Sequence, residues 1–501
     1  MMNSIEQNFL SSISRIPRHG LGLSVDVYTP DLFELTGALD REDLPYDYLE
    51  IFKASQPALA VVRGRLPATR LTYHGEGLWL TQPEMAHSHQ FGRAFSTAAS
   101  HLATLRSAWI NHECATKEMA GYSFGTYLPP LFTNATADIT ASNVRLIQQR
   151  LATSECFADD KEPIVLIEIP PLTYFGAGDL SVEAFFRRIV AQVPCGLVLD
   201  IGHVWTVYRY SGQWRERSLG AFLAEFLDRF PLQRVVQIHV AGLDAHQQVT
   251  AASDDRSARS SSREALPLWI DAHSAPIPEV VWDMLAQVLS HPGLTNLKGL
   301  ALEVDTKPVS QTVAEFRRLC ERFGDRFDRV RLSTAEPAGA PVITVSDGGT
   351  HPETSEHSAF ARHDDADDAY VRTLIKADAP SDVIRFFDQD RTGLDLYRRH
   401  YLRHEILEWG GNVREMFPRT ARQLEARGLS QNSFVDHWFG RPRMGPDEYD
   451  FFLLKIERFV EFVGKVLPDS LQIAVQEATH LREAYRQANE RIFDDLVFVK
   501  E

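Results

Sequence analysis

Eight short apolar runs recur between Gly20 and Leu332, and they constrain the fold more than any other feature of the chain. Such a run is typical of a buried parallel strand, because crossover helices cover both of its faces. The predicted strands are Leu21–Val27, Tyr48–Phe52, Arg70–His74, Ala108–His112, Ile164–Ile169, Gly196–Ile201, Arg234–Val240 and Lys298–Val304. A strand followed by a longer amphipathic stretch, repeated in this way, predicts an α/β fold, a (β/α)8 barrel of the TIM type.

Helical spacing of apolar residues is clear in several of the stretches between these runs. The predicted helices are Phe91–Leu105, Val182–Val193, Leu219–Phe230 and Val280–Leu289. Each of them lies between two predicted strands, as the crossover helices of a parallel barrel must.

Polar residues stand at the carboxyl ends of six runs, where the loops of a parallel barrel open onto one shared mouth. These residues are His74, His112, Glu168, Asp200, His239 and Glu303, and His203, Asp271 and His273 lie in the segments that follow. One such residue alone is commonly a helix cap or a hydrogen-bonded core histidine. Nine together would be costly to bury without compensation, so they predict a cluster of bound cations.

The ligand types narrow the choice of metal. Imidazole and carboxylate groups without thiolate suit iron, manganese or zinc, whereas sites made only of oxygen ligands suit magnesium or calcium. Nine candidate ligands exceed the needs of one ion. At about four protein ligands or fewer per ion, with positions left open for substrate, two or three ions fit.

Several of these segments together resemble the multinuclear non-haem iron-dependent oxidases. The most specific part is Gln237-Ile238-His239-Val240-Ala241-Gly242 with Asp271-Ala272-His273 downstream, and the similarity covers roughly residues 19 to 310. The resemblance implies a barrel that holds two or three iron ions in mixed Fe(II)/Fe(III) states and uses dioxygen as co-substrate. It also implies that the nine residues named above are metal ligands and that Asp271 additionally transfers a proton.

The same resemblance implies a substrate, since members of this family modify a residue of a ribosomally made precursor peptide. The chain departs from the family pattern after Glu168, where relatives commonly have Asn and this chain has Ile169. The segment Cys114–Pro130 carries the aromatic residues Tyr122, Phe124 and Tyr127, which either line a substrate path or pack the loop.

Composition changes after the last predicted strand, and this predicts three regions. Residues 1–332 form the barrel domain. Residues 333–368, rich in Ala, Pro, Gly, Ser, Thr, His and Asp, are predicted to be a flexible acidic linker. Residues 369–501 show helical spacing, as in Leu394–Trp409 and Pro446–Val466, and predict a smaller all-α C-terminal domain.

The C-terminal region more loosely resembles the helical partner proteins that present precursor peptides to such oxidases. The similarity lies in Tyr397–Tyr401, in Asn412–Thr420 and in Phe434–Phe439. We therefore expect a fusion of oxidase and peptide-presenting domain, so that no separate partner protein is needed. The alternative is a helical cap that only stabilises the barrel or a dimer.

Charge and composition exclude other classes of function. Lys and Arg number 52 against 68 Asp and Glu, a formal charge of −16, so no broad basic surface for nucleic acid is expected. No apolar run reaches the roughly 18 residues of a membrane span, and the four cysteines form no CxxC pair, so we expect a cytoplasmic protein without disulfides. Two rival functions remain open. One is a divalent-metal hydrolase or sugar isomerase of the xylose-isomerase type, and the other is a peptide-binding protein without catalysis.

Overall fold

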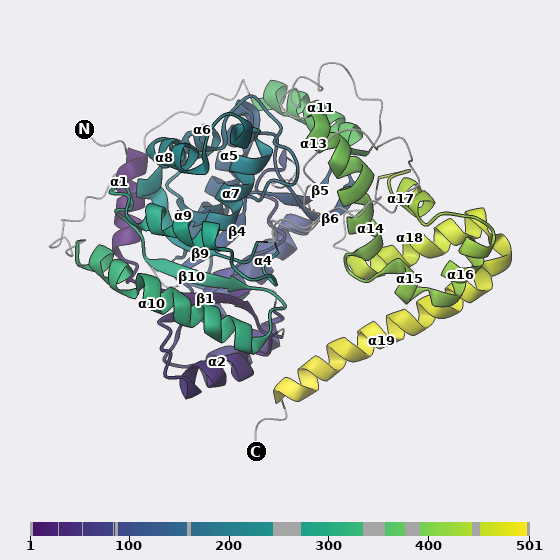
Figure 1. Cartoon of the computed structure of the whole chain (residues 1–501), viewed down its shortest axis with the longest axis horizontal. Helices are drawn as coiled ribbons and strands as arrows, with labels where there is room; N and C mark the ends of the chain where they lie inside the picture. Colours follow the sequence, from purple (N-terminus) through teal and green to yellow (C-terminus); the bar gives the residue numbers. More distant parts are fainter. Residues whose placement is uncertain are drawn as a thin grey trace.

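The N-terminal part of the chain is a closed barrel of eight parallel strands, in the order β1-β10-β9-β8-β7-β4-β3-β2 (Figure 1). The computed structural model describes residues 4–28, 30–52, 54–83, 85, 89–157, 162–243, 272–333, 356–375, 391–442 and 451–497. The barrel strands are β1 Gly20–Asp26, β2 Tyr48–Phe52, β3 Arg70–His74, β4 Trp109–Glu113, β7 Ile164–Glu168, β8 Gly196–Asp200, β9 Val235–Val240 and β10 Gly299–Val304. All eight predicted strands and the barrel are thus confirmed.

Helices cover the outside of the barrel between successive strands (Figure 1). They are α2 Leu32–Arg41, α3 Gln56–Arg65, α4 His89–Leu105, α5 Asn134–Ala152, α6 Val182–Val190, α7 Ile201–Tyr210, α8 Leu219–Arg229, α9 Glu279–Leu289 and α10 Val309–Ser333. The four predicted helices correspond to α4, α6, α8 and α9. Among the described residues, no helix combines the length and the apolarity needed to cross a membrane.

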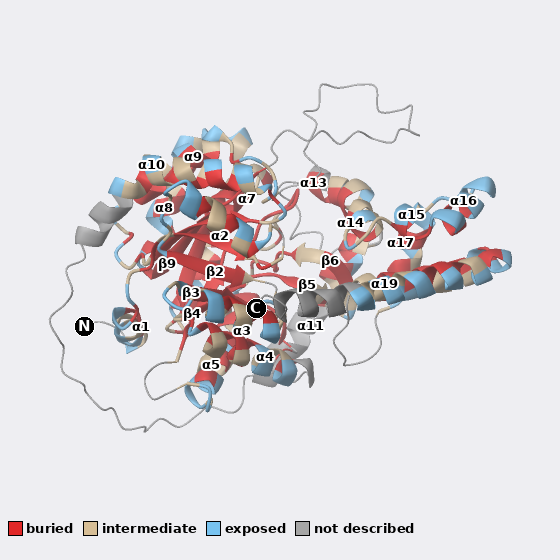
Figure 2. Ribbon diagram, turned by 90° about the horizontal axis from the view of Figure 1, so that it is seen from below, coloured by how far each residue is buried: buried red, intermediate tan, exposed pale blue. Residues whose placement is uncertain are grey.

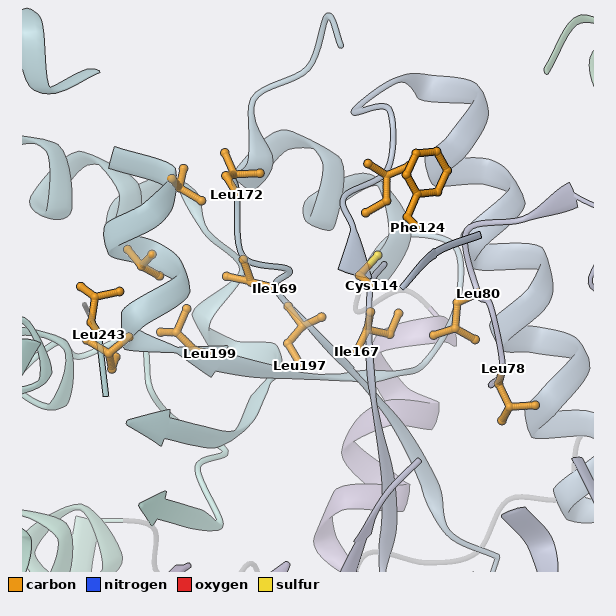
Figure 3. Packing of buried hydrophobic residues seen from close by; sticks show 14 of the residues in the cluster. Leu78, Leu80, Cys114, Phe124, Ile167, Ile169, Leu172, Leu197, Leu199 and Leu243 are labelled. Carbon is orange, nitrogen blue, oxygen red and sulfur yellow. The ribbon is translucent and has the colours of Figure 1, made fainter. Parts of the chain in front are cut away.

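The side chains of each strand alternate between the barrel interior and the outer helices, as the period of two requires. Inside, Tyr48 and Trp109 are fully buried in an apolar cluster that α1 Ser4–Ser14 closes with Phe9 and Ile13. A second cluster lies outside the strands, where Figure 3 shows Ile167, Leu197 and Leu199 among its members. Alternate residues of one strand therefore fill the barrel interior or pack against the outer helices.

A two-stranded antiparallel hairpin, β5 Thr116–Met119 and β6 Tyr122–Leu128, leaves the barrel directly after β4 and lies between the barrel and the C-terminal helices (Figures 1 and 2). Its aromatic residues pack against those helices. The ring centroids of Tyr122 and Phe124 lie 6.5 and 5.7 Å from that of Phe439. The segment predicted as a loop is therefore a hairpin, and these two aromatic side chains serve packing.

The C-terminal region is helical, as predicted. Its elements are α11 Glu356–Ile375, α13 Arg391–Leu396, a π-helical turn Tyr397–Tyr401, α14 Leu402–Glu408, α15 Val413–Met416, α16 Pro418–Ala426, α17 Asn432–Trp438, α18 Phe451–Val466 and α19 Leu471–Val497. Residues 446–450 of the predicted helix Pro446–Val466 lie outside the described residues.

Buried aromatic side chains join this helical region to the barrel. Tyr397 and Tyr401 pack edge-on against Phe175 and Tyr174 of the segment after β7, with ring centroids 5.2 and 5.8 Å apart. The indole nitrogen of Trp438 donates a hydrogen bond of 2.9 Å to the backbone oxygen of Ser123 in β6. Barrel and helical residues thus belong to one hydrophobic cluster.

The hairpin and α18 meet at Gly125, which has a φ of +78°. A Cβ atom at this position would lie 2.6 Å from Cζ of Phe451, so only glycine allows the ring to pack here. The packing of Phe451 in α18 against the hairpin thus requires glycine at position 125.

The structure shows helices at both ends of the predicted linker, residues 333–368. Helix α10 continues to Ser333, and α11 begins at Glu356, so residues 356–368 of the predicted linker are helical. Just beyond the predicted linker, Tyr370 of α11 donates a hydrogen bond of 3.1 Å to the backbone oxygen of Pro129. Residues 334–355 lie outside the described residues. The division into three domains stays a prediction.

We expect Gly22→Ala to destabilise the protein, because a Cβ atom there would lie 2.5 Å from Cδ1 of Tyr48 and 2.3 Å from its backbone oxygen. Overpacking of this kind costs about 1–3 kcal/mol. Gly64→Ala in α3 is the matched control, since its Cβ would meet nothing within 4 Å and should gain about 0.5–1 kcal/mol of helix propensity. The midpoints of urea unfolding followed by circular dichroism measure both, and an equal shift for the two variants would contradict the packed interior.

Candidate metal centre

Buried carboxylates and imidazoles converge at the carboxyl ends of the barrel strands, in two groups that share one residue. In each group, one ligand atom from every member lies within 4.8 Å of the others. The first group is Glu168, Asp200, His239 and Glu303, and the second is His74, Glu113 and Glu168. Each member is the last or next-to-last residue of its strand, so the closed barrel brings all six to one end.

His239 stands between the carboxylates of the first group. Its Nδ1 atom lies 3.0 Å from Oε1 of Glu168 and 3.0 Å from Oε2 of Glu303. One N–H can point along only one of these directions, and Oε2 of Glu303 has no hydrogen-bond partner among the described residues. The ring's other nitrogen, Nε2, lies 2.8 Å from Oε1 of Glu50.

Glu168 connects the two groups, because its two oxygens face different partners. While Oε1 faces His239, Oε2 accepts a hydrogen bond of 2.6 Å from Nδ2 of Asn111 and lies 3.3 Å from Nε2 of His74. If metal ions bind, Glu168 could be a ligand in either group, because it belongs to both.

The donor set fits metal ions of the kind that the sequence predicts. Three buried carboxylates within 4.8 Å of one another repel strongly in a low-dielectric interior, and one imidazole cannot satisfy them all. A divalent cation would offset the charge of Glu303, whose Oε2 has no hydrogen-bond partner among the described residues, together with the charges of its neighbours. Imidazole and carboxylate ligands without thiolate suit iron, manganese or zinc.

The charges of these groups alter their protonation. Burial lowers the pKa of His74, but the hydrogen bond and charge of Glu168, together with the charge of Glu50, raise it to about 9. Burial also opposes the charged form of His239, yet the surrounding carboxylates raise its pKa well above the usual range. A metal ion must therefore displace a proton from each ligating nitrogen, so its affinity falls as the pH falls.

His203 and His273 lie beside the first group. Asp200 caps α7 by accepting a hydrogen bond of 2.7 Å from the backbone N–H of His203, and Nδ1 of His203 donates to the backbone oxygen of Ile169 at 2.6 Å. The rings of His203 and His273 stack with centroids 6.2 Å apart, and Nδ1 of His273 lies 3.8 Å from Oε1 of Glu303. The backbone carbonyl of Ile169 thus orients the ring of His203.

Two further predicted ligands are not brought into these groups. Asp271 lies outside the described residues. His112 is buried, but its Nδ1 donates to the backbone oxygen of Glu113 at 2.8 Å, and its Nε2 accepts from the backbone N–H of Leu78 at 3.1 Å. The alternation of β4 explains this placement, since Asn111 and Glu113 face the interior and His112 faces outward.

Sequence reasoning missed three residues of the site: Glu50, Asn111 and Glu113. A signal for Asn111 and Glu113 was present, because Trp109, Asn111 and Glu113 follow one another at every second position of one strand. Glu50 is a charged residue in the middle of the apolar run Tyr48–Phe52, and burial of such a residue requires partners on the same face.

The comparisons with known proteins identify the family of the chain. A profile of the family described as RiPP precursor modification enzyme MbnB/TglH/ChrH matches residues 18–322. A UPF0276 protein of Caulobacter vibrioides is 27% identical over 286 residues, covering 55% of this chain and 85% of the relative. A UPF0276 protein of Bordetella parapertussis is 26% identical over 261 residues, covering 50% and 74%.

Solved structures with a similar course of the chain include endonuclease IV from Thermus thermophilus. That likeness has a TM-score of 0.36 at 16% identity, and it covers 61% of this chain and 99% of the other. The profile match, in contrast, spans more than half of the chain and the whole set of barrel strands. The chain belongs to the family of RiPP precursor modification enzymes that MbnB, TglH and ChrH define.

Proposed function

We propose that this chain is an iron- and dioxygen-dependent oxidase that modifies one residue of a ribosomally made precursor peptide. The observation that carries the proposal is Glu168, a buried carboxylate shared by two groups of imidazole and carboxylate ligands. Bound iron would supply the one-electron and oxygen chemistry that no side chain provides. The ligands proposed for two or three irons are His74, Glu113, Glu168, Asp200, His203, His239, Asp271, His273 and Glu303. The predicted ligand His112 is replaced by Glu113, because both ring nitrogens of His112 have backbone hydrogen-bond partners.

The chain's own residues orient and separate these ligands. Asn111 holds one oxygen of Glu168, Glu50 faces the outer nitrogen of His239, and the carbonyl of Ile169 fixes the ring of His203. Asp271 is proposed to transfer a proton beside its role as a ligand. Burial of the six clustered residues keeps bulk water away from the centre.

The C-terminal helical region is proposed to hold the precursor peptide, so that no separate presenting protein is required. It packs on the hairpin that begins three residues after Glu113, which places it beside the carboxyl ends of the strands. A peptide held there would need only a short path to the metal centre.

Removing the shared carboxylate should remove more metal than removing an unshared one. We expect Glu168→Ala to lose most of about two or three irons per chain, because both groups lose a ligand, whereas Glu303→Ala should retain the iron of the second group. Iron per folded chain is measured by mass spectrometry of the metal content after anaerobic purification. Glu279→Gln on the surface is the control, and unchanged iron in Glu168→Ala would refute the site.

The reaction itself can be identified by co-expression with the small open reading frames encoded beside this chain. We expect a mass change in one peptide that depends on both iron and dioxygen. Peptide mass spectrometry after aerobic and anaerobic incubation provides the measurement. A zinc-loaded preparation that is equally active without dioxygen would favour the rival function, a divalent-metal hydrolase or sugar isomerase.

The site of peptide binding can be mapped by hydrogen exchange on the full chain. If the helical region presents the peptide, the amides of residues 391–442 and 451–497 should exchange more slowly when the modified peptide of the preceding experiment is present. A peptide of the same composition in scrambled order serves as control. Protection confined to the barrel would show that the helical region is only a structural cap.

A further inference from the structure

Glu50 is a fully buried carboxylate in the middle of β2 and belongs to neither group of candidate ligands. Its Oε1 atom lies 2.8 Å from Nε2 of His239, on the side of the imidazole that faces away from Glu168 and Glu303. A charge buried this deeply is costly unless its contacts serve the fold or the site.

Three hydrogen bonds, from β1, β3 and β4, hold the Glu50 carboxylate in place. The hydroxyl of Ser24 donates to Oε1 at 3.1 Å, while the indole of Trp109 and the hydroxyl of Thr72 donate to Oε2 at 3.2 and 3.4 Å. Ser24 and Thr72 are the direct neighbours of Glu50 in the strand register of β1 and β3. The carboxylate is therefore fixed by the barrel itself.

The contact between Glu50 and Nε2 of His239 is an ion pair by distance, because Nε2 has no aligned hydrogen bond among the described residues. An ionised carboxylate only accepts hydrogen bonds, so this contact favours a proton on the imidazole nitrogen that it faces. That preference leaves Nδ1 of His239 as the nitrogen with an available lone pair. Nδ1 is the atom that lies 3.0 Å from both Glu168 and Glu303. Carboxylates that accept from the outer nitrogen of a metal-binding histidine commonly set its tautomer and ring orientation.

We propose that Glu50 is a positioning residue that orients His239 and fixes its tautomer, so that Nδ1 is the atom that binds metal. This inference rests on the proposed function in one respect, the binding of metal by the first group. A purely structural Glu50 would influence folding but would not influence the coordination of a metal that is already bound.

The isosteric variant Glu50→Gln tests the tautomer directly. Its amide has one acceptor oxygen and one donor NH2, so the NH2 must face either His239 or the N–H of Trp109. With the NH2 toward His239, the tautomer that Glu50 imposes is opposed; with the NH2 toward Trp109, two donors face each other and the side chain is displaced. Glu50→Ala removes the carboxylate altogether. Tyr48→Phe is the matched control, since Tyr48 is buried on the same strand and its hydroxyl is paired with Gln237 rather than with a candidate ligand.

The affinity for Fe(II) is measured by anaerobic titration of the purified full chain, and the visible spectrum of the Co(II)-loaded protein reports the coordination. We expect both Glu50 variants to bind Fe(II) about 10- to 100-fold more weakly and to show an altered Co(II) spectrum. Tyr48→Phe should retain the affinity and the spectrum of the unmodified chain.

Two results would be adverse, and they are distinguishable. If Glu50→Gln and Glu50→Ala are folded and match the unmodified chain in affinity and spectrum, the positioning role of Glu50 is overturned while the proposed metal site stands. If the unmodified chain itself binds neither ion, the proposed function fails and the role of Glu50 fails with it.

Discussion

Repulsion among three buried carboxylates is the constraint on which this barrel depends. Glu168, Asp200 and Glu303 have oxygens within 4.8 Å of one another, and all three are almost completely buried. Two such charges about 4 Å apart repel by roughly 4 kcal/mol even at an effective dielectric constant of about 20. His239 offsets part of this repulsion, and bound metal ions would offset the rest. Bound metal ions would thus link the stability of the protein to its metal affinity.

The lower half of the barrel supplies the rigidity that such a centre requires. Tyr48 and Trp109 fill the interior, and Gly22 leaves the room that the Tyr48 ring occupies. Trp109 also connects this apolar interior to the candidate metal ligands. Its indole nitrogen donates to Glu50, and Glu50 in turn faces His239. The orientation of His239 thus depends on Glu50 and, through Glu50, on Trp109 in the barrel interior.

The barrel could be predicted from the sequence because buried parallel strands are apolar on both faces and therefore stand out as runs. Locating the ligands was harder, because a run shows where a strand ends but not which of its residues face inward. His112 was chosen as a strand-end residue, although the alternation of β4 directs Glu113 into the barrel instead. The signal for Glu50 was only a charged residue in the middle of an apolar run, which does not show what its partners are. Its contacts with Ser24 and Thr72 arise only once the barrel has closed.

The helical region was predicted to be tethered, and its position on the barrel changes what presentation of a peptide would require. A flexible tether raises the effective concentration of a bound peptide but does not orient it. Here Phe439 and Trp438 pack on the hairpin β5–β6, and the chain enters this hairpin at Cys114, whose backbone N–H donates a hydrogen bond of 3.0 Å to the backbone oxygen of Glu168. If the helical region holds the peptide, the surface that binds it is joined through one short hairpin to the shared carboxylate of the metal centre. Orientation of the substrate would then come from the packing of the hairpin, and the residues 334–355 between the two parts would need no role in it.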